Sequence, residues 1–492
     1  MVRLTASDFV TYFRPSKCEN RIYLRHIGKK ESEPSPYDQV LLNLGQKHET
    51  RHLSSFTDFV DIREGSLQER EDKTKKAIEH NSPAIYHPIL TSIHKFGAKD
   101  YQIIGEPDFL VKQDDKYIIR DSKISRRITE NDHPEILRQV EIYGWLYEQN
   151  FKKPPASLQV HSGTGEIVIV PYGGGGKALA LLEHISNLKT AKTEIYTPAG
   201  WSKCGGCPFN YYCWLRAEKN RDVALVPDVD QNLVLALKNN GINSIGDLLQ
   251  NYDEETLAEF KRPWGERMQK VGKKSVSIMR MARAISDGKE ILIQSPQIPS
   301  YPNYVMFDLE GLPPQLDELE KIYLWGTQVF GNHPGDYMPA TAGFGVEGDR
   351  EGWMQFLINA SAIFNEYGDI PFVHWHHYER VKIDLYLERY GDQNEIAQRV
   401  KSNLLDLLPI TQYSVALPLP SYSLKVVEKH IKFKRTLEDV AGNWAMAMYI
   451  EAIETEDVGK RDELMNQILT YNKEDLEATW AVLEWLKSKI SD

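Results

Sequence analysis

The alternation of apolar and polar positions predicts a β-hairpin in the first third of the chain. Residues 105–123 read GEPDFLVKQDDKYIIRDSK, in which two runs rich in Val, Ile, Phe and Tyr flank a short polar stretch. This pattern is typical of two antiparallel strands joined by a tight turn. A turn centred on the Asp-Asp pair would place Asp108 directly opposite Asp121, on one face of the hairpin. Lys123 follows two residues later and points to that same face.

Two neighbouring segments show the apolar periodicity of helices. Residues 37–56 form the first and carry His48, while residues 135–147 form the second and carry Gln139 and Tyr143 one turn apart. Side chains at that spacing project from the same side of a helix. A surface or packed histidine is an alternative reading of His48, and core packing is an alternative reading of Tyr143.

The last third of the chain also places carboxylates on regular elements. An apolar strand, YVMFDLE, carries Asp308 and Glu310 two residues apart and therefore on one face. Near the end of the chain, Tyr471 and Asp475 lie at positions i and i+4 of a predicted helix and project the same way. We expect these side chains to form a second acidic site.

Length and composition restrict the class of protein. A chain of 492 residues corresponds to about three domains, and an apolar fraction of 41% with 26% charged residues is typical of globular proteins. Collagen-like, coiled-coil and wholly disordered chains are therefore excluded. No apolar run approaches the roughly 18 residues of a membrane span, and the N-terminal sequence lacks a signal-peptide core. We expect a cytoplasmic protein without a membrane partner.

The net charge of −11 is unevenly distributed along the chain. Residues 1–220 contain 31 basic and 28 acidic side chains, residues 221–300 contain 11 of each, and residues 301–492 contain 17 basic and 31 acidic ones. The net charge thus does not argue against a nucleic-acid partner, and we expect binding to begin on the slightly basic first part.

The four cysteines have the spacing of metal ligands. Three form the pattern C-x-x-C-x5-C at Cys204, Cys207 and Cys213, and Cys18 lies far upstream. Disulfides are not expected in a cytosolic protein, although scattered buried thiols remain an alternative. Four thiolates at one centre suit either zinc or an iron–sulfur cluster, and the residues alone leave both open. Either centre would join the beginning of a domain to its end.

The order of the motifs in the first part resembles the RecB-like branch of the PD-(D/E)-x-K nucleases. The motifs are G-x-x-H ending at His48, which is the loosest, G-x-x-D ending at Asp108, D-x-K from Asp121, and Q-x-x-x-Y from Gln139. The resemblance covers about residues 1–220. It implies that His48, Asp108 and Asp121 bind Mg²⁺ or Mn²⁺, that Lys123 is catalytic and that Gln139 and Tyr143 hold the nucleic acid. It also implies a 4Fe–4S cluster on the four cysteines.

The last part is similar to the tyrosine subtype of the DEDD exonucleases, which have an RNase H-like fold. D-x-E at Asp308 and Glu310 and Y-x-x-x-D ending at Asp475 match the first and last motifs. The middle motif departs, because His374, Tyr378 and Glu379 stand for Asn, Phe and Asp. The resemblance implies that Asp308, Glu310, Glu379 and Asp475 bind two metal ions and that Tyr471 orients a water. An inactive domain of the same fold is the alternative.

The middle of the chain carries weaker signals. The run VPYGGGGKALALL resembles a phosphate loop but has the wrong residues at two of its positions, so it predicts a loop before a helix and no ATPase motor. Residues 221–290 have helical periodicity, with two short helices around NNGI that suggest a helix–hairpin–helix element. A plain helical spacer is equally compatible. The proline-rich SPQIPSYP marks the next boundary.

These observations predict a multidomain α/β protein. We expect a restriction-endonuclease-like α/β nuclease domain at residues 1–220, a helical linker at 221–298 and an RNase H-like α/β domain at 299–492. The expected activity is metal-dependent hydrolysis of DNA by an exonuclease that acts on single strands or ends. RNA is also open as a substrate. The alternatives are a nucleic-acid-binding scaffold with silent sites and a zinc-stapled interaction platform.

Overall fold

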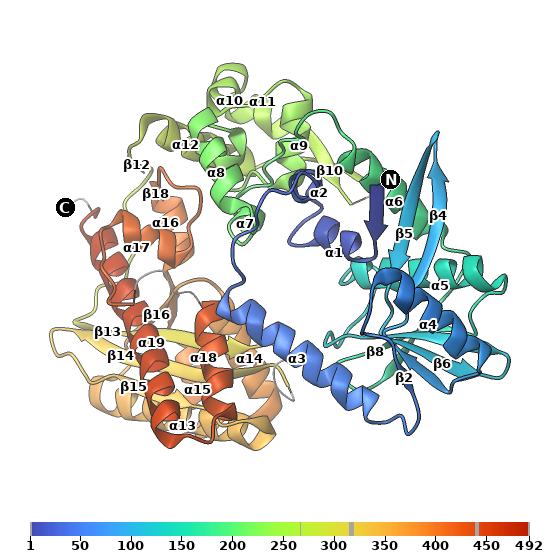
Figure 1. Ribbon diagram of the computed structural model, residues 1–492. Coiled ribbons are helices and arrows are strands. Elements are labelled where there is room, and N and C mark those ends of the chain that lie inside the picture. Colours follow the sequence, from blue (N-terminus) through green and yellow to red (C-terminus); the bar gives the residue numbers. More distant parts are fainter. Residues whose placement is uncertain (1, 266, 314–318, 438–441, 491–492) are drawn as a thin grey trace. The chain divides into compact units, whose positions relative to one another are not determined.

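A computed structural model describes residues 2–265, 267–313, 319–437 and 442–490 (Figure 1). The chain divides into two compact units, which are described separately. The first comprises residues 1–34, 38–198 and 203–213, and the second comprises residues 35–37, 199–202 and 214–492. Both mix helices with sheets, as predicted for a multidomain α/β protein. None of the described helices is long and apolar enough to cross a membrane. The division into three domains stays a prediction.

The first unit contains a six-stranded and a three-stranded sheet. The larger sheet has the order β2-β3-β6-β7-β8-β9 and the smaller the order β1-β5-β4. The strands are β1 (Val2–Thr5), β2 (Val60–Asp61), β3 (Ala84–Tyr86), β4 (Leu90–Phe96), β5 (Lys99–Gly105), β6 (Phe109–Gln113), β7 (Lys116–Ser122), β8 (Leu158–His161) and β9 (Ile167–Val170).

The predicted hairpin is confirmed by the pairing of β6 with β7. Phe109 faces Arg120 and Gln113 faces Lys116, so the turn is centred on the Asp-Asp pair as the sequence predicts. Asp114 has a φ of +53°, a conformation that Asp tolerates in tight turns. The register carries Asp108, directly before β6, to the end of the hairpin where Asp121 lies.

Helix α5 (Pro134–Phe151) contacts strands of both sheets of the first unit and contributes to its core. It begins with a proline, whose fixed φ suits the first helical turn, and ends at Lys152 in a left-handed conformation. The other helices of this part are α1 (Ser7–Phe13), α2 (Glu19–His26), α3 (Pro36–Leu53), α4 (Leu67–Glu79), α6 (Gly176–Lys189), α7 (Trp201–Cys204) and α8 (Asn210–Asn220). The expected loop before a helix is confirmed, since α6 follows the glycine run.

The described part of residues 221–298 consists mainly of helices, with one hairpin and the short strand β12 (Ile291–Leu292). The helices are the 3₁₀ turn η1 (Val223–Leu225), α9 (Gln231–Asn239), α10 (Ile245–Asn251), α11 (Glu254–Glu259) and α12 (Lys274–Asp287). Strands β10 (Lys261–Trp264) and β11 (Arg267–Lys270) form an antiparallel pair where we expected helix. Pro263 and Gly265, the latter with a φ of +59°, disfavour a helix there and favour a turn.

The second unit also contains a five-stranded sheet with the order β15-β14-β13-β16-β17. Strands β15, β14 and β13 are antiparallel, whereas β13, β16 and β17 run parallel. The strands are β13 (Asn303–Leu312), β14 (Lys321–Gly331), β15 (Met338–Thr341), β16 (Phe372–His374) and β17 (Leu404–Asp406), and a separate pair joins β12 (Ile291–Leu292) to β18 (Val415–Ala416).

Alternation along β13 separates the core from the acidic site. Val305, Phe307 and Leu309 pack in one apolar cluster with side chains of α13, α14 and α15. Asp308 and Glu310 therefore project from the opposite face, where α18 and α19 contact β13. The helices are α13 (Gly345–Tyr367), α14 (Tyr378–Tyr390), α15 (Ile396–Ser402), α16 (Leu407–Ser414), α17 (Leu424–His430), α18 (Gly442–Glu454) and α19 (Val458–Lys487).

Candidate active sites

The first candidate site lies at the end of the β6–β7 hairpin. Asp108 is buried and accepts a hydrogen bond of 2.6 Å from the backbone N–H of Ser122. Asp121 is 1% exposed and forms an ion pair of 2.5 Å with Lys123 Nζ. Burial and the carboxylate of Asp121 raise the pKa of Asp108 well above its usual range. Two carboxylates and one ammonium group thus share a pocket that is largely shielded from water.

Lys123 keeps its charge in this environment. Burial alone would lower its pKa, but the carboxylates of Asp121 and Asp108 raise the pKa of Lys123 above its usual value. The backbone N–H of Lys123 donates to the carbonyl of His161, at the end of the adjacent strand β8. The strand pairing therefore positions the lysine, which stays cationic beside the two acids.

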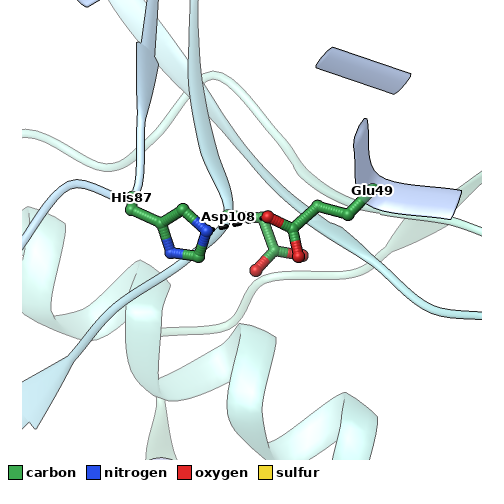
Figure 2. A group of neighbouring side chains, drawn as sticks. All are labelled: Glu49, His87 and Asp108. Atoms are coloured by element: carbon green, nitrogen blue, oxygen red, sulfur yellow. Dashed lines mark hydrogen bonds and ion pairs between the residues drawn. The ribbon is translucent and has the colours of Figure 1, made fainter. Parts of the chain in front are cut away.

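Two residues that sequence reasoning missed complete this cluster. Glu49 from α3, His87 after β3 and Asp108 bring one ligand atom each within 4.8 Å of one another (Figure 2). His87 Nε2 lies 2.7 Å from a Glu49 oxygen, and its Nδ1 lies 3.2 Å from Glu106. Although burial opposes it, hydrogen bonds that His87 donates to Glu106 and Glu49 raise its pKa to about 9. A histidine between carboxylates is also a common ligand set for a divalent cation.

His48 lies on the same helix but not in this group. Its ring stacks on His161 with centroids 4.4 Å apart, and its Nε2 lies 3.3 Å from the His161 carbonyl oxygen. His52 also stacks on the ring of His161, with ring centroids 3.9 Å apart. Glu49, the residue after His48, approaches Asp108 instead. The role of His48 as a metal ligand stays a prediction.

Helix α5 carries both predicted nucleic-acid-binding residues, and Tyr143 is the one that reaches this site. Tyr143 is buried, and burial together with the charges of Asp121 and Asp108 raises its pKa well above the usual range. A Cβ added at Gly105 would lie 2.7 Å from the Tyr143 ring, so the glycine makes room for it. Gln139 is also buried, and its Oε1 makes no hydrogen bond within the described residues.

The second candidate site combines strand β13 with helix α19. Asp308, Glu310 and Asp475 bring their carboxylate oxygens within 4.8 Å of one another. Burial, Asp475 and Glu310 raise the pKa of Asp308 well above its usual range, and burial with Asp475 does the same for Glu310. Three of the four predicted carboxylates are thus gathered at one point.

Asn472 fixes Asp308 in this cluster. Its Nδ2 donates a hydrogen bond of 2.7 Å to Asp308, and its Oδ1 accepts one of 2.8 Å from the Tyr337 hydroxyl. A Cβ at Gly326 would lie 1.8 Å from that Asn472 oxygen, so only glycine fits opposite the amide. The sequence signal that could have found Asn472 is its position directly after Tyr471.

Two cationic side chains reach Asp475. Arg435 donates both to Asp475 and, in a two-pronged contact, to Glu428 of α17. Lys425 Nζ lies 3.4 Å from Asp475 and over the Tyr471 ring, 4.3 Å from its centroid. The second acidic cluster is therefore partly neutralised by the protein itself.

Tyr471 and Glu379 lie near this cluster with different partners. Tyr471 is buried, and burial with the charges of Asp475 and Glu310 raises its pKa above the usual range. Glu379 is buried too, but its carboxylate lies 3.0 Å from His374 Nδ1, and it is not one of the three grouped ligands. Its charge still contributes to raising the pKa of Asp308.

The four cysteines lie in one neighbourhood of the first unit, and none of them forms a disulfide within the described residues. Burial, followed by the nearby Cys18, Cys207 and Cys204, raises the pKa of Cys213 to about 12. The backbone N–H of Cys207 donates to the Cys204 carbonyl, so these two lie within one turn. Among the described residues, no three of the sulfur atoms lie within 4.8 Å of one another.

Comparison with known proteins assigns both parts of the chain. Residues 25–214 match the model of the PD-(D/E)XK nuclease superfamily, and residues 305–487 match that of the RNase H superfamily. No curated protein matches the chain. Among solved structures, the crystal structure of SSO0001 is 16% identical and aligns over 36% of this chain and 96% of its own length. Its TM-score is 0.20, so it supports no further argument.

The two family matches confirm the nuclease architecture that the motifs predict. Each match falls on the part of the chain where we expected that superfamily, and both superfamilies indicate a nuclease that hydrolyses nucleic acid. The two acidic clusters are suited to divalent cations of the Mg²⁺ or Mn²⁺ type.

Proposed function

Because the chain joins a PD-(D/E)XK nuclease domain to an RNase H superfamily domain, we propose that it hydrolyses DNA with divalent metal ions. The preferred substrates are single strands or ends, attacked as by an exonuclease, and the first site is the principal one. The observation that carries this proposal is the pair of buried carboxylates, Asp108 and Asp121, beside the half-buried Lys123 at the end of one hairpin. RNA is the other substrate class that the test includes.

The ligand set fits a hard divalent cation. Asp108 and Glu49 would hold it, together with His87 once that ring has lost its proton. Asp121 is the further ligand that the motif predicts, although it lies outside this group of three. Buried carboxylates this close repel one another unless a proton or a cation lies between them. A bound Mg²⁺ or Mn²⁺ supplies a more acidic water and positive charge near the scissile phosphate. Lys123 stabilises negative charge that develops on the phosphate oxygens.

Substrate contacts come from helix α5 in this proposal. Gln139 offers an amide whose oxygen has no hydrogen-bond partner within the described residues, and Tyr143 offers a phenol beside the two carboxylates. A buried acceptor without a partner is costly, and an N–H or O–H group of a bound strand could donate to it, while the amide Nε2 of Gln139 can donate to a phosphate oxygen. These residues would therefore orient the phosphodiester toward the metal site.

The second site supports a second candidate function. Asp308, Glu310, Glu379 and Asp475 with Tyr471 would form a two-metal exonuclease site. The contacts of Arg435 and Lys425 with Asp475 instead favour a domain that binds nucleic acid without cleaving it. A protein cation beside a carboxylate reduces the affinity of that carboxylate for Mg²⁺. His374 likewise already engages Glu379.

We also infer that the four cysteines bind a 4Fe–4S cluster. The four cysteines lie close enough for Cys18, Cys207 and Cys204 to raise the pKa of Cys213. Four thiolates at one centre suit a cluster, in which each binds a different iron, and they also suit zinc. Such a cluster would join Cys18 to the segment of Cys204–Cys213. Zinc is the alternative that the test below separates.

Cleavage of labelled single-stranded DNA in Mn²⁺ tests the principal site. Asp121→Ala and Lys123→Ala should each lose nearly all cleavage, because they remove a metal ligand and the catalytic ammonium. Asp308→Ala should retain most of it. Asp114→Asn, in the exposed turn of the same hairpin, is the matched control. Full activity in the first two variants with loss in Asp308→Ala would move the principal site to the second domain.

Metal analysis of anaerobically purified protein tests the cysteine centre. A cluster predicts absorbance near 400 nm and about four irons per chain, both lost in Cys207→Ser. A colourless protein with one zinc would show that the centre is a zinc site.

A further inference from the structure

A basic hairpin stands out in the middle of the chain. We define it as β10 and β11 together with the lysines that follow, residues 261–274, which contain six basic residues and one acidic residue. The unit to which it belongs is otherwise rich in acids, since residues 301–492 alone contain 31. Lys261, Arg267 and Lys270 are exposed. A concentration of positive charge on an acidic unit indicates a polyanionic partner.

The hairpin exposes two large apolar side chains as well. Trp264 is 57% exposed and Met268 is 61% exposed. The register places Trp264 opposite Arg267, so an indole and a guanidinium share one face of the ribbon near its tip. Flat aromatic rings beside cationic side chains are the recurring surface on which the bases of single strands stack.

The base of the hairpin is fixed while its tip is exposed. Arg262 is buried, lies 2.6 Å from Asp230 and holds its guanidinium over the Trp264 ring at 4.7 Å. Asp230 in turn caps α9 by accepting from the backbone N–H groups of Asn232 and Leu233. The indole is therefore presented in a defined orientation, which lowers the entropy cost of stacking on it.

The cross-strand pairing would be unfavourable without a ligand for these charges. Lys261 is directly opposite Lys270, and like charges in that position destabilise a sheet. Glu259 forms an ion pair with Lys270 and compensates part of this repulsion. A two-stranded ribbon is only marginally stable, so this arrangement is better explained by a bound anion than by folding.

The charge continues from the hairpin into a cleft. Lys273 and Lys274, both exposed, line a cavity of about 440 Å³ between α12 and the end of α16. Arg280 of α12 and Tyr413 of α16 line the same cavity, and Tyr413 is 70% exposed. The cleft thus repeats the combination of lysine, arginine and an exposed aromatic ring.

We propose that the basic hairpin and this cleft bind single-stranded nucleic acid. Trp264 and Tyr413 stack with bases, and Lys261, Arg267 and Lys274 contact phosphates. The inference rests on the proposed function and deepens it, because it gives the second unit a binding surface separate from both acidic sites. Stacking and phosphate contacts are available to every base, so binding is tolerant of sequence.

Fluorescence anisotropy with a labelled dT30 strand tests the proposal. The full chain carries Lys123→Met and is measured in EDTA, so that binding is followed without cleavage. Trp264→Ala should weaken binding about tenfold, and Trp264→Phe should restore most of it. Lys261→Gln with Arg267→Gln should lower the steepness of the salt dependence by about 1.4. Arg350→Gln with Lys460→Gln, also exposed residues of this unit, removes the same charge as a control.

Three further ligands separate the sources of the anion. A U30 strand that binds like dT30 supports the proposal, because stacking and phosphates are common to both. A 30-base-pair duplex bound more tightly, with the same dependence on Trp264, would overturn the preference for single strands. Vesicles of phosphatidylserine that bind through the hairpin while dT30 does not would overturn the proposal altogether. So would hairpin variants with the affinity of the control variant.

The outcome is separable from that of the proposed function. A chain that binds dT30 through the hairpin but cleaves nothing in Mn²⁺ refutes the nuclease proposal and leaves the hairpin inference standing. If the full chain cleaves single strands but the hairpin variants bind dT30 with unchanged affinity, the nuclease proposal stands and the hairpin inference is refuted.

Discussion

The two acidic clusters differ in the origin of the positive charge beside them. In the first, Lys123 comes from the same strand as Asp121 and pairs with that one carboxylate. In the second, Lys425 of α17 and Arg435 of the segment after α17 approach Asp475. In the first arrangement a metal ion must displace the proton of His87 to reach Glu49 and Asp108, whereas in the second Arg435 and Lys425 already engage one of the three grouped ligands.

This difference shows how the same residue types can serve two tasks. A lysine fixed by strand geometry beside a metal site assists catalysis, because it stays where charge develops. An arginine held between Glu428 and Asp475 completes a buried ion-pair network, which stabilises a single arrangement of the site. We therefore expect the first cluster to be catalytic and the second to depend on whether its arginine is displaced.

The largest expected effect comes from exchanging each lysine for the uncharged side chain of similar length. Lys123→Met should lower the rate of DNA cleavage by about 10³-fold, because it removes the cation nearest the reacting phosphate. Lys425→Met should change the rate less than about threefold. Single-turnover cleavage in Mn²⁺ measures both. Equal losses in the two variants would remove the distinction between the sites.

Removal of the arginine should open the second site to metal. Arg435→Met leaves Glu428 and Asp475 buried without their partner, which should lower the free energy of unfolding by about 3 kcal/mol in EDTA. Mn²⁺ should restore much of that stability by binding the freed carboxylates. Thermal unfolding with and without Mn²⁺ measures this. Arg350→Met, on an exposed position of the same unit, should show neither effect.

Substitutions on α3 determine which of its side chains belongs to the first site. Glu49→Gln should raise the Mn²⁺ concentration required for half-maximal cleavage by about 10- to 100-fold, as for the loss of a ligand. His48→Gln should raise it less, because its ring faces His161. A metal titration of cleavage measures both. The reverse order would show that α3 rotates when metal binds and that His48 is the ligand.

The smallest effect is expected from the amide that positions Asp308. Asn472→Ala removes the hydrogen bonds to Asp308 and Tyr337 and should lower the free energy of unfolding by about 1–3 kcal/mol. Urea unfolding of the full chain measures it, with Asn466→Ala on the same helix as the control. Cleavage by the first site should be unchanged, and a large loss there would show that the two units are coupled.

The sequence predicts those parts of both sites that depend on local geometry. The hairpin register follows from the turn, so the approach of Asp108 to Asp121 is predictable from spacing. Alternation along β13 and the helical repeat of α19 likewise predict that Asp308, Glu310 and Asp475 share a site. These predictions need only the periods of strand and helix.

The remaining residues come from tertiary contacts that spacing does not show. Glu49 and His87 belong to a helix and a strand end with no recognisable motif, and His87 reaches the site through a positive φ of 51°. Arg435 approaches from a segment without regular pattern. The β10–β11 hairpin was missed because a period of 3.6 and a period of two are hard to distinguish over four-residue strands.

Helix α3 is attached to the first unit in an unusual way. None of its 18 residues is buried, and its described contacts with the sheet are made by His48, Glu49 and His52, through imidazole rings and a carboxylate. A helix whose apolar side chains are at most half-buried opens at low free-energy cost. Amide hydrogens of residues 45–53 should therefore exchange quickly in EDTA and slowly in Mn²⁺. The concentration of free metal would then set the fraction of molecules in which α3 is in place and the site is complete. Substrate would meet a complete site only when metal is already bound.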